Sequence, residues 1–433
     1  MVRIGFGSHS QTLGPDLPTA QRRLNSSCDN ARRIIALRIL AATSSTLLHF
    51  SQPTEIDVEP GSDDGGILLV SHSERCTNQD EPPMATDTLR IGIIGAGANT
   101  RSRHIPGLRM QNSVEIVGVA NRSAESSQKA AKELDIPKAY GDWTEIIANK
   151  SIDAVCIGTW PYTHAEMTIA ALDAGKRVLC EARMAMNARE AHAMLAASRR
   201  NPSQIAQIVP APMTLPVDRT IADTIAGGAI GNVIAIDLCV SIGDYPNPDL
   251  PLHWRQSRDF SGNNIMALGI WYEQMARWVG HASSAFALGQ VVVKHRRDES
   301  GARVPITIPD HVDVTGQLQQ GGQYHLLLSS VLGHTPRKTE AWIFGDKGTL
   351  AFITPNNAEP YLQLGKKGGA MGALAIDPAK LGAWRVEEEF VNAVRGLEGV
   401  THTDFVTAVK YMEWTDAVTL SMRERREVQL PLL

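Results

Sequence analysis

The chain has 433 residues, of which 43% are hydrophobic, and its 46 acidic and 42 basic side chains give a net charge of −4. This length and apolar content are enough for two or three domains with buried cores. Acidic and basic residues are interspersed, so the sequence has neither a basic stripe for nucleic acid nor a polybasic patch for a membrane surface. We therefore expect no nucleic-acid partner and no membrane partner.

The five cysteines form no Cys-x-x-Cys pair, and Cys156 and Cys180 lie in apolar, strand-like runs. This pattern favours a reduced, cytoplasmic protein without a zinc ribbon or a disulfide framework. The sequence analysis accordingly predicts no metal site.

Residues 1–88 differ from the rest of the chain, being rich in Ser, Pro, Asn and Arg and lacking a sustained period. We expect this segment to be a disordered or spurious N-terminal extension. Its arginine bias resembles that of a mitochondrial transit peptide. The apolar run at 34–50 is interrupted by Arg38 and is too short and too polar to span a bilayer.

An apolar run at 91–94 leads into a Gly-x-Gly turn and then a helix-like segment. Gly95 permits the tight turn, and Gly97 lets the backbone approach a pyrophosphate at the N–H groups of Ala98 and Asn99. Thr100 stands where the full fingerprint has its third glycine. The stretch predicts the first strand and phosphate loop of a dinucleotide-binding domain.

Further apolar runs follow at 114–120, 154–158 and 178–180, with a helical composition at 124–134. These runs are continuous rather than alternating, which is typical of parallel strands covered by helices on both faces. We predict an α/β protein whose residues 89–209 form an NAD(P)-binding Rossmann domain with a doubly wound parallel sheet.

The end of the second predicted strand indicates which cofactor binds. An acidic residue there would bind the ribose 2′-hydroxyl of NAD, but the chain has Asn121-Arg122-Ser123. Arg122 can pair with a 2′-phosphate, while Asn121 and Ser123 offer neutral hydrogen bonds. We therefore predict NADP, with NAD possible; the alternative is that Arg122 is an ordinary solvated loop residue.

Residues 210–433 differ in composition and pattern from the preceding domain. They contain Pro-rich segments, Gly-rich turns and strand-like runs in which apolar and polar residues alternate. Alternating strands are expected at 233–240, 323–332 and 338–344, and helices at 217–226, 265–279, 385–395 and 405–422. These elements predict one α+β domain with a mostly antiparallel, open sheet. The uncovered sheet face would be a natural oligomer surface, because one side of the sheet needs covering.

Several motifs together resemble the glucose-fructose oxidoreductase and inositol dehydrogenase (Gfo/Idh/MocA) family over residues 89–433. The segments that resemble the family are 90–97, 103–108, 159–164, 170–181, 254–255, 268–269, 276–278, 344–349, 390–395 and 428–431. The resemblance implies NAD(P)-dependent redox chemistry on sugars, cyclitols and related alcohols. It also implies a substrate site between the Rossmann domain and the sheet domain, and a homodimer or homotetramer that assembles through the open sheet.

The chain differs from the family at the positions where the family has its catalytic residues. Ala182 and Arg183 follow Glu181 in place of the family's Lys-Pro, so the catalytic amine is missing. Ala267 and Trp271 stand where the family has an aspartate and a proton-exchanging histidine. Trp160 and Pro161 replace the family's Pro and Asn, although His164 remains.

Other residues must then supply acid–base chemistry. We expect Arg183 to polarise a carbonyl or clamp an anion, His253 to exchange the proton, and Tyr272 to assist; Tyr162, His164 and Glu273 are further candidates. The expected cofactor-binding residues are Gly95, Gly97, Ala98, Asn99, Asn121, Arg122, Ser123, Thr159, His164 and Glu181. The expected substrate-binding residues are Trp160, Arg255, Asn264 and Trp271, where Trp271 would stack on a sugar face.

Three functions remain open from the sequence. The first is an NADP-dependent oxidoreductase that acts on a carbohydrate-like small molecule with a non-standard acid–base set. The second is a lyase or hydrolase that uses a bound cofactor transiently or not at all. The third is a non-catalytic, cofactor-binding regulator, because a fold does not by itself secure a function.

Overall fold

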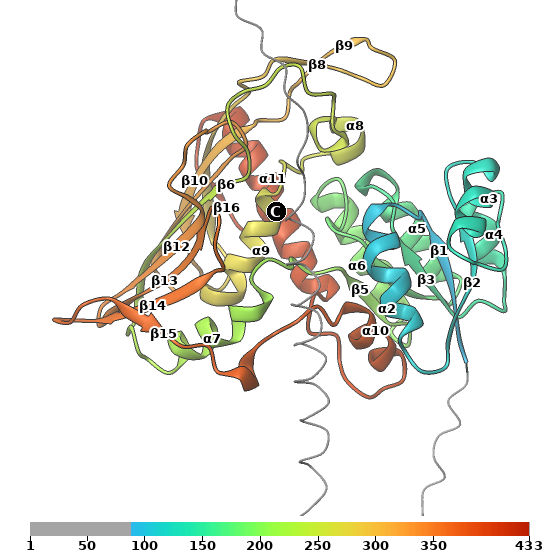
Figure 1. Cartoon of the computed structure of the whole chain (residues 1–433), viewed down its shortest axis with the longest axis horizontal. Helices are drawn as coiled ribbons and strands as arrows, with labels where there is room; N and C mark the ends of the chain where they lie inside the picture. Colours follow the sequence, from blue (N-terminus) through green and yellow to red (C-terminus); the bar gives the residue numbers. More distant parts are fainter. Residues whose placement is uncertain (1–87, 433) are drawn as a thin grey trace, which may run out of the picture. The chain divides into compact units, whose positions relative to one another are not determined.

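The computed structural model describes residues 88–432, so the proposed N-terminal extension lies outside the described residues except for Thr88. Two large sheets with the helices packed on them, and a separate two-stranded hairpin, make up this region (Figure 1). The predicted α/β class, with a parallel Rossmann sheet and a mostly antiparallel second sheet, is confirmed.

The first sheet has five parallel strands in the order β2-β1-β3-β4-β5. The strands are β1 (Leu89–Ile94), β2 (Val114–Ala120), β3 (Ala154–Ile157), β4 (Arg177–Cys180) and β5 (Ala206–Ile208). All four residues of β3 are buried, as expected for a central strand covered on both faces. The carboxyl ends of β1, β3 and β4 therefore meet at one edge of this sheet, where ligands bind in doubly wound folds.

Three of the helices packed on this sheet begin at a side-chain cap. The helices are a π-helical turn η1 (Thr100–His104) continued by α2 (Ile105–Arg109), then α3 (Ala124–Glu133), α4 (Trp143–Ala148), α5 (Pro161–Asp173) and α6 (Ala188–Arg200). The side chains of Ser123, Asp142 and Asn187 accept backbone N–H groups at the starts of α3, α4 and α6.

The second sheet has nine strands in the order β15-β14-β13-β12-β6-β11-β10-β7-β16. Of the pairs in this sheet, only β6 with β11 is parallel. The strands are β6 (Val233–Ser241), β7 (Ser284–Gln290), β10 (His311–Gln317), β11 (Gln323–Ser329), β12 (Arg337–Gly345), β13 (Gly348–Pro355), β14 (Tyr361–Lys366), β15 (Gly372–Leu374) and β16 (Val428–Gln429). A separate hairpin joins β8 (His295–Arg297) to β9 (Arg303–Pro305).

The second half also contains the longer helices α7 (Leu215–Ala226), α9 (Leu268–Val279), α10 (Val386–Val394) and α11 (Phe405–Glu424), and the short turns η2 (Trp254–Gln256), α8 (Arg258–Ser261) and η3 (Pro378–Lys380). Helix α9 begins three residues later than the sequence predicted, because Met266 has a positive φ of 45°. No helix of residues 88–432 is long and apolar enough to cross a bilayer.

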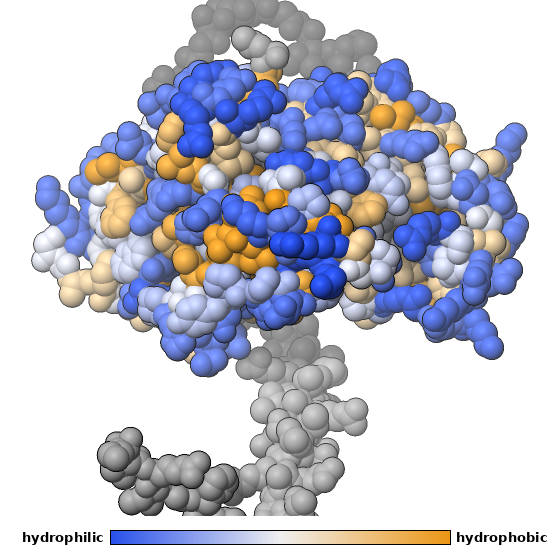
Figure 2. Space-filling view, turned by 90° about the horizontal axis from the view of Figure 1, so that it is seen from above, coloured by the Kyte–Doolittle hydropathy of each residue, from blue (hydrophilic) through white to orange (hydrophobic). Residues whose placement is uncertain are grey.

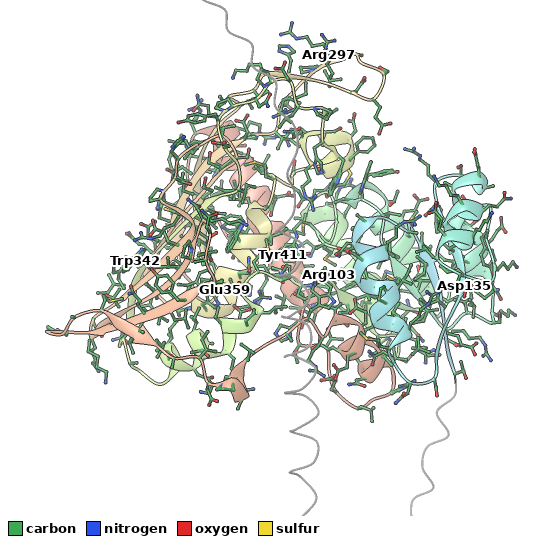
Figure 3. All side chains as sticks on the ribbon, viewed as in Figure 1. Arg103, Asp135, Arg297, Trp342, Glu359 and Tyr411 are labelled. Atoms are coloured by element: carbon green, nitrogen blue, oxygen red, sulfur yellow. The ribbon has the colours of Figure 1, made fainter. Side chains whose placement is uncertain are left out.

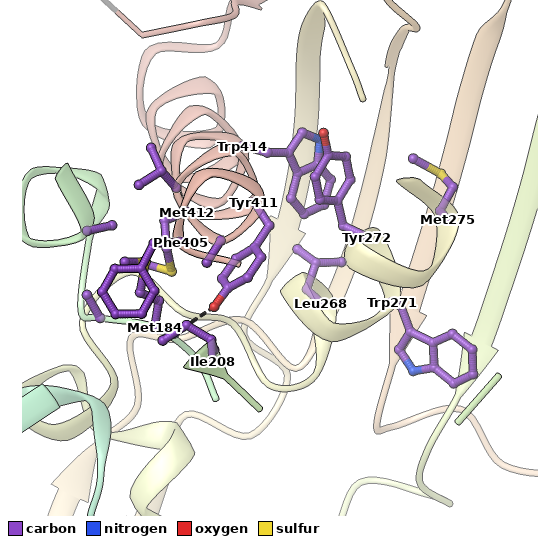
Figure 4. Close-up of a cluster of buried hydrophobic side chains, with 14 of the residues drawn as sticks. Met184, Ile208, Leu268, Trp271, Tyr272, Met275, Phe405, Tyr411, Met412 and Trp414 are labelled. Atoms are coloured by element: carbon purple, nitrogen blue, oxygen red, sulfur yellow. Dashed lines mark hydrogen bonds between the residues drawn. The ribbon is translucent and has the colours of Figure 1, made fainter. Parts of the chain in front are cut away.

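Helix α11 connects the parts of the core, since it packs against both α6 and β7. Figure 4 shows Tyr272 of α9 lying flat on Trp414 of α11, with ring centroids 4.1 Å apart. In the same view the hydroxyl of Tyr411 accepts the N–H of Met184, at 2.8 Å. This bond ties α11 to the loop after β4, which fixes that loop against the buried core.

A smaller core brings the end of the chain back to the first sheet. Phe390 and Val391 of α10 are fully buried in a cluster with Ile91 and Leu108. Helix α10 packs on α2 in this core. The proposed domain boundary at residue 209 stays a prediction.

The face in Figure 2 is mostly hydrophilic around its rim, with a contiguous hydrophobic area near its middle.

Candidate active site

A cavity of about 440 Å³ lies at the carboxyl edge of the first sheet. It is lined by the phosphate loop, the segments after β3 and β4, and residues from the second half of the chain. Eight of the predicted site residues line it, namely Gly97, Ala98, Asn99, Thr159, Trp160, Glu181, Arg183 and Arg255. Arg103, Trp254, Ile270 and Trp384 also line it, and Figure 3 marks Arg103 on the side of the first sheet.

The phosphate loop has the geometry that a pyrophosphate requires. Gly95 has a φ of 88°, and a Cβ there would lie 2.7 Å from Cγ2 of Thr159. A Cβ on Gly97 would lie 3.3 Å from the carbonyl oxygen of Gly158 and would narrow the opening beside an exposed stretch of backbone. The positive φ requires glycine at Gly95, as expected for a tight turn, and the close carbonyl of Gly158 favours glycine at Gly97. The role of Gly97 toward a diphosphate stays a prediction.

A glycine at the end of β3 compensates for the missing third glycine of the phosphate-loop motif. Thr100 is buried at that position, and its hydroxyl would clash with a Cβ on Gly158. Gly158 therefore provides, from the end of β3, the space that a glycine in the helix usually provides. The threonine consequently leaves the close packing of helix and sheet intact.

The three residues after β2 have different roles. Asn121 accepts the N–H of Ala96 at 2.8 Å and donates to the carbonyl of Ser126, so it holds the phosphate loop against α3. Ser123 caps α3. Arg122 is exposed and has no hydrogen-bond or ion-pair partner among the described residues, which leaves its guanidinium free for a ligand.

A buried chain of two carboxylates and one imidazole supports the cavity wall. His104 is fully buried, with Nε2 2.9 Å from Oε1 of Glu181 and Nδ1 2.5 Å from Oε1 of Glu387. Burial opposes the charge on His104, but the bonds and charges of the two glutamates raise the pKa of His104 to about 9. His104 is therefore an imidazolium near neutral pH.

Glu181 is the member of this chain that faces the cavity. It also accepts hydrogen bonds from the side chain of Asn99 and from the N–H of Ala182. Burial would raise the pKa of Glu181, yet His104, Asn99 and the Ala182 N–H together lower it to about 2. His104 and Glu387 were not among the predicted site residues, because no local signal in the sequence links His104 to a glutamate 283 residues away.

Arg183 is at the cavity wall but is already paired. Its Nη1 donates to Oε2 of Glu273 at 2.7 Å, and its guanidinium lies 4.6 Å above the ring of Tyr411. Burial lowers the pKa of Arg183, but the charge of Glu273 outweighs it and the pKa is raised. Most of the positive charge of Arg183 is therefore balanced inside the core.

Arg255 is an unpaired cation of the cavity, as is Arg103, whose guanidinium lies over Trp384. Its guanidinium lies 4.2 Å above the ring of Trp254, and it has no ion-pair or hydrogen-bond partner for its side chain in the described part of the chain. Burial and the nearby charge of Arg183 lower the pKa of Arg255. Trp254 in turn stacks on Trp160 with an interplanar angle of 12°, so the cavity has an aromatic wall with a free guanidinium on it.

Asn264 lies in a small cavity that shares Ala182, Arg183 and Arg255 with the main one. Its amide nitrogen donates to the carbonyls of Ala185 and Ser261, while its buried Oδ1 has no partner. An unpartnered buried oxygen next to the cavity is a potential acceptor for a substrate hydroxyl.

The structure does not bring the remaining candidates to the cavity wall. His253 is exposed and caps η2, where its Nδ1 accepts the N–H of Arg255 at 3.2 Å. Tyr272 is 1% exposed, and its hydroxyl accepts the N–H of Ala282. Trp271 is 4% exposed and belongs to the hydrophobic core. His164 is fully buried between the carbonyls of Thr159 and Arg183, and because burial lowers its pKa, the neutral ring donates its one N–H to one of these carbonyls.

Comparison with known proteins agrees with this geometry. The profile described as "Oxidoreductase family, NAD-binding Rossmann fold" matches residues 89–207, and the "GFO/IDH/MocA C-terminal domain" matches residues 219–351. A trans-1,2-dihydrobenzene-1,2-diol dehydrogenase of Bos taurus is 27% identical over 274 residues, covering 62% of this chain and 75% of that protein. A 1,5-anhydro-D-fructose reductase of Ensifer adhaerens is 32% identical over 181 residues, covering 41% of this chain and 52% of the reductase.

Solved structures show the same fold. A levoglucosan dehydrogenase in complex with NADH and L-sorbose superposes with a TM-score of 0.69 at 21% identity, over 79% of this chain and 99% of that one. The fold and the matched domains define an oxidoreductase with an NAD-binding Rossmann domain. The chain belongs to the Gfo/Idh/MocA family of oxidoreductases.

Proposed function

We propose that this protein is an NADP-dependent oxidoreductase that interconverts an alcohol and a carbonyl on a cyclic, carbohydrate-like substrate. One observation carries the proposal: a single cavity joins the phosphate loop to Glu181, Arg255 and the stacked Trp160–Trp254 wall. A dinucleotide that binds this loop directs its reactive end toward that wall, because the loop and the wall belong to the same cavity.

The preference for NADP rests on Arg122. Its free guanidinium stands at the end of β2, next to the start of α3, where a 2′-phosphate lies in dinucleotide-binding domains. No acidic side chain occupies the three positions after β2 to repel that phosphate. The nicotinamide of the bound cofactor supplies or accepts the hydride.

The aromatic wall supports a polyhydroxylated ring as the substrate. Apolar ring faces stack on indoles, while the hydroxyl groups at the rim need hydrogen-bond partners. Arg255 and the free Oδ1 of Asn264 offer a donor and an acceptor beside Trp254. The names of the relatives, a dihydrodiol dehydrogenase and an anhydrofructose reductase, support a cyclic hydroxylated compound of this kind.

Glu181 is our candidate for proton exchange. Among the side chains that line the cavity it is the only carboxylate, and the described lining includes no histidine, lysine, tyrosine or cysteine. At neutral pH Glu181 is ionised beside the His104 imidazolium, so in alcohol oxidation it accepts the hydroxyl proton, and in carbonyl reduction it passes the proton of His104 to the substrate oxygen. The proton that His104 loses is then replaced from solvent. Arg255 stabilises negative charge that develops on the substrate oxygen.

The proposal is tested by incubating the purified protein with NADPH and, separately, NADH against a panel of cyclic keto-sugars and inosose-type ketones. We expect oxidation of NADPH with at least one panel member and formation of the matching alcohol. Cleavage or elimination products would support the lyase or hydrolase reading. Tight binding of NADPH without turnover on any panel member would support the regulator reading.

A further inference from the structure

A second group of chemically active side chains lies on the second sheet, outside the cavity. Asp237 and Cys239 are two residues apart on β6, so both point to the face opposite to the buried Ile236 and Leu238. His325 of β11 lies directly beside Asp237 in the register of the two strands. One ligand atom from each of Asp237, Cys239 and His325 lies within 4.8 Å of the other two.

The histidine is already oriented as a metal ligand would be. Its Nδ1 lies 2.6 Å from Oδ1 of Asp237, and its Nε2 lies 2.8 Å from Oδ1 of Asp313 on β10. Histidines that bind metals usually donate their other ring N–H to a carboxylate, which fixes the ring and its tautomer. Asp313 occupies that supporting position, and Nδ1 points to the side where Asp237 and Cys239 lie.

The charge around this point also favours a cation. The titratable groups that face it are Asp237, Cys239, His325, Asp313, and Glu340, which is directly opposite Cys239 in the register with β12. Glu340 is paired with Arg337 at 2.5 Å, so the two remaining aspartates surround one histidine. The side chains of Asp237 and His325 are 48% and 37% exposed, which lets an ion reach them from solvent.

A structural ion pair would account for His325 and its two aspartates but not for the thiol. The one hydrogen-bond partner of Cys239 among the described residues is Oδ1 of Asp237, 3.8 Å from Sγ. A nitrogen, an oxygen and a sulfur ligand that converge on one point match the preference of Zn²⁺, which binds in tetrahedral sites of mixed ligands.

We propose that Asp237, Cys239 and His325 bind one Zn²⁺, with Asp313 as a positioning residue and a water in the fourth position. The ion would join β6 to β11, the one parallel pair among the described strands of this sheet. Parallel pairing is slightly less stable per residue than antiparallel pairing, so a cross-link at this place stabilises the middle of the sheet. The site is independent of the proposed redox reaction.

The test uses the full-length protein, stripped with a chelator and then titrated with Zn²⁺ against a chromophoric competitor. We expect one Zn²⁺ per chain and a higher melting temperature in its presence. Replacement by Co²⁺ should give the thiolate-to-cobalt charge-transfer absorption that reports a cysteine ligand. No competition for Zn²⁺, or cobalt binding without that absorption, would overturn the proposal.

Variants separate this site from other ligands of the chain. Cys239→Ser should remove the charge-transfer band, and His325→Asn should remove binding, whereas Asp313→Asn should weaken it by about 10- to 100-fold. The matched control is His311→Asn, a histidine on β10 two residues from Asp313, which should bind normally. Cys156 and Cys180 are buried, so a band that persists in Cys239→Ser would identify a different thiol and contradict the assignment. Unchanged NADPH binding verifies that each variant is folded.

Discussion

His104 joins Glu181 to Glu387 through both of its ring nitrogens, at 2.9 Å and 2.5 Å, and so connects the helix after the phosphate loop to the end of β4 and to α10. Neither glutamate is near His104 in the sequence. This buried chain of groups holds the one carboxylate that the described part of the cavity wall offers.

The first prediction concerns pH and stability. His104 keeps its proton up to about pH 9 in the folded protein, but an ordinary histidine in the unfolded chain loses it near 6.5. The folded state therefore binds more protons between these values, and the free energy of unfolding should fall as pH rises from 6.5 to 9. The contribution is on the order of 3 kcal/mol and is fully present just below pH 6.5.

Urea unfolding of the unmodified protein and of His104→Gln at pH 6, 7.5 and 9 measures this effect. The stability difference between the two proteins should be largest at pH 6 and smallest at pH 9. His192→Gln is the control, because His192 is a half-exposed histidine that also pairs with a glutamate. A difference that stays constant over this range would show that His104 is not protonated in the folded protein.

The second prediction is that Arg183 stabilises the folded protein through its ion pair with Glu273. Arg183→Met should destabilise the protein by about 3 to 5 kcal/mol, because the variant leaves Glu273 buried without its closest cation. The double variant Arg183→Met with Glu273→Gln should recover part of this loss. Thermal unfolding measures both, and an undiminished melting temperature for the single variant would mean that the pair contributes nothing to stability.

The third prediction assigns Arg255 to the substrate. Arg255→Met keeps a long side chain over Trp254 but removes the free guanidinium, so stability should change little. kcat/KM should fall by about 10-fold or more, since a charge-assisted hydrogen bond is worth roughly 1.5 to 3 kcal/mol. Steady-state kinetics with NADPH held at saturation measures the effect. Unchanged kinetics would place the substrate away from Trp254.

The fourth prediction concerns cofactor choice. Arg122→Ala should weaken NADPH binding by about 10-fold or more and leave NADH binding nearly unchanged, because only NADPH has the 2′-phosphate. Fluorescence titration of both cofactors measures this, with Arg189→Ala on exposed α6 as the matched control. Equal weakening of the two cofactors would mean that Arg122 contacts the adenine alone, and tighter binding of NADH by the unmodified protein would refute the preference.

The sequence predicted the main strands of the first sheet well because each is a continuous apolar run. The predicted strand at 114–120 coincides with β2, and that at 154–158 differs from β3 by one residue. Boundaries were less accurate where a single backbone conformation decides them. The strand predicted at 323–332 ends at Ser329, where the chain turns toward His334, whose φ is 54°.

Site residues were predictable where a local motif fixes them and unpredictable where distant segments meet. Gly95 and Gly97 follow from the motif alone. The partner of Arg183 is Glu273, 90 residues away, so the sequence could not show that this arginine is already neutralised. Similarly, the expectation of no metal site stays a prediction, but the sequence could not show that pairing of β6 with β11 brings His325 within 4.8 Å of Cys239.

Single-turnover kinetics of Glu181→Gln tests the central claim most directly. The variant keeps the size of the side chain and can still bond to His104, so NADPH binding should stay within a few-fold of the unmodified protein. The rate of NADPH oxidation by an accepted carbonyl substrate should fall by about 10²- to 10⁴-fold, the range for a general acid–base group.

His253→Ala and Glu166→Gln serve as comparators in the same experiment. Glu166 is an exposed glutamate on α5, and His253 is exposed outside the cavity, so both variants should keep the unmodified rate. An undiminished single-turnover rate in Glu181→Gln, together with a large loss in His253→Ala, would contradict the account and return the proton transfer to His253.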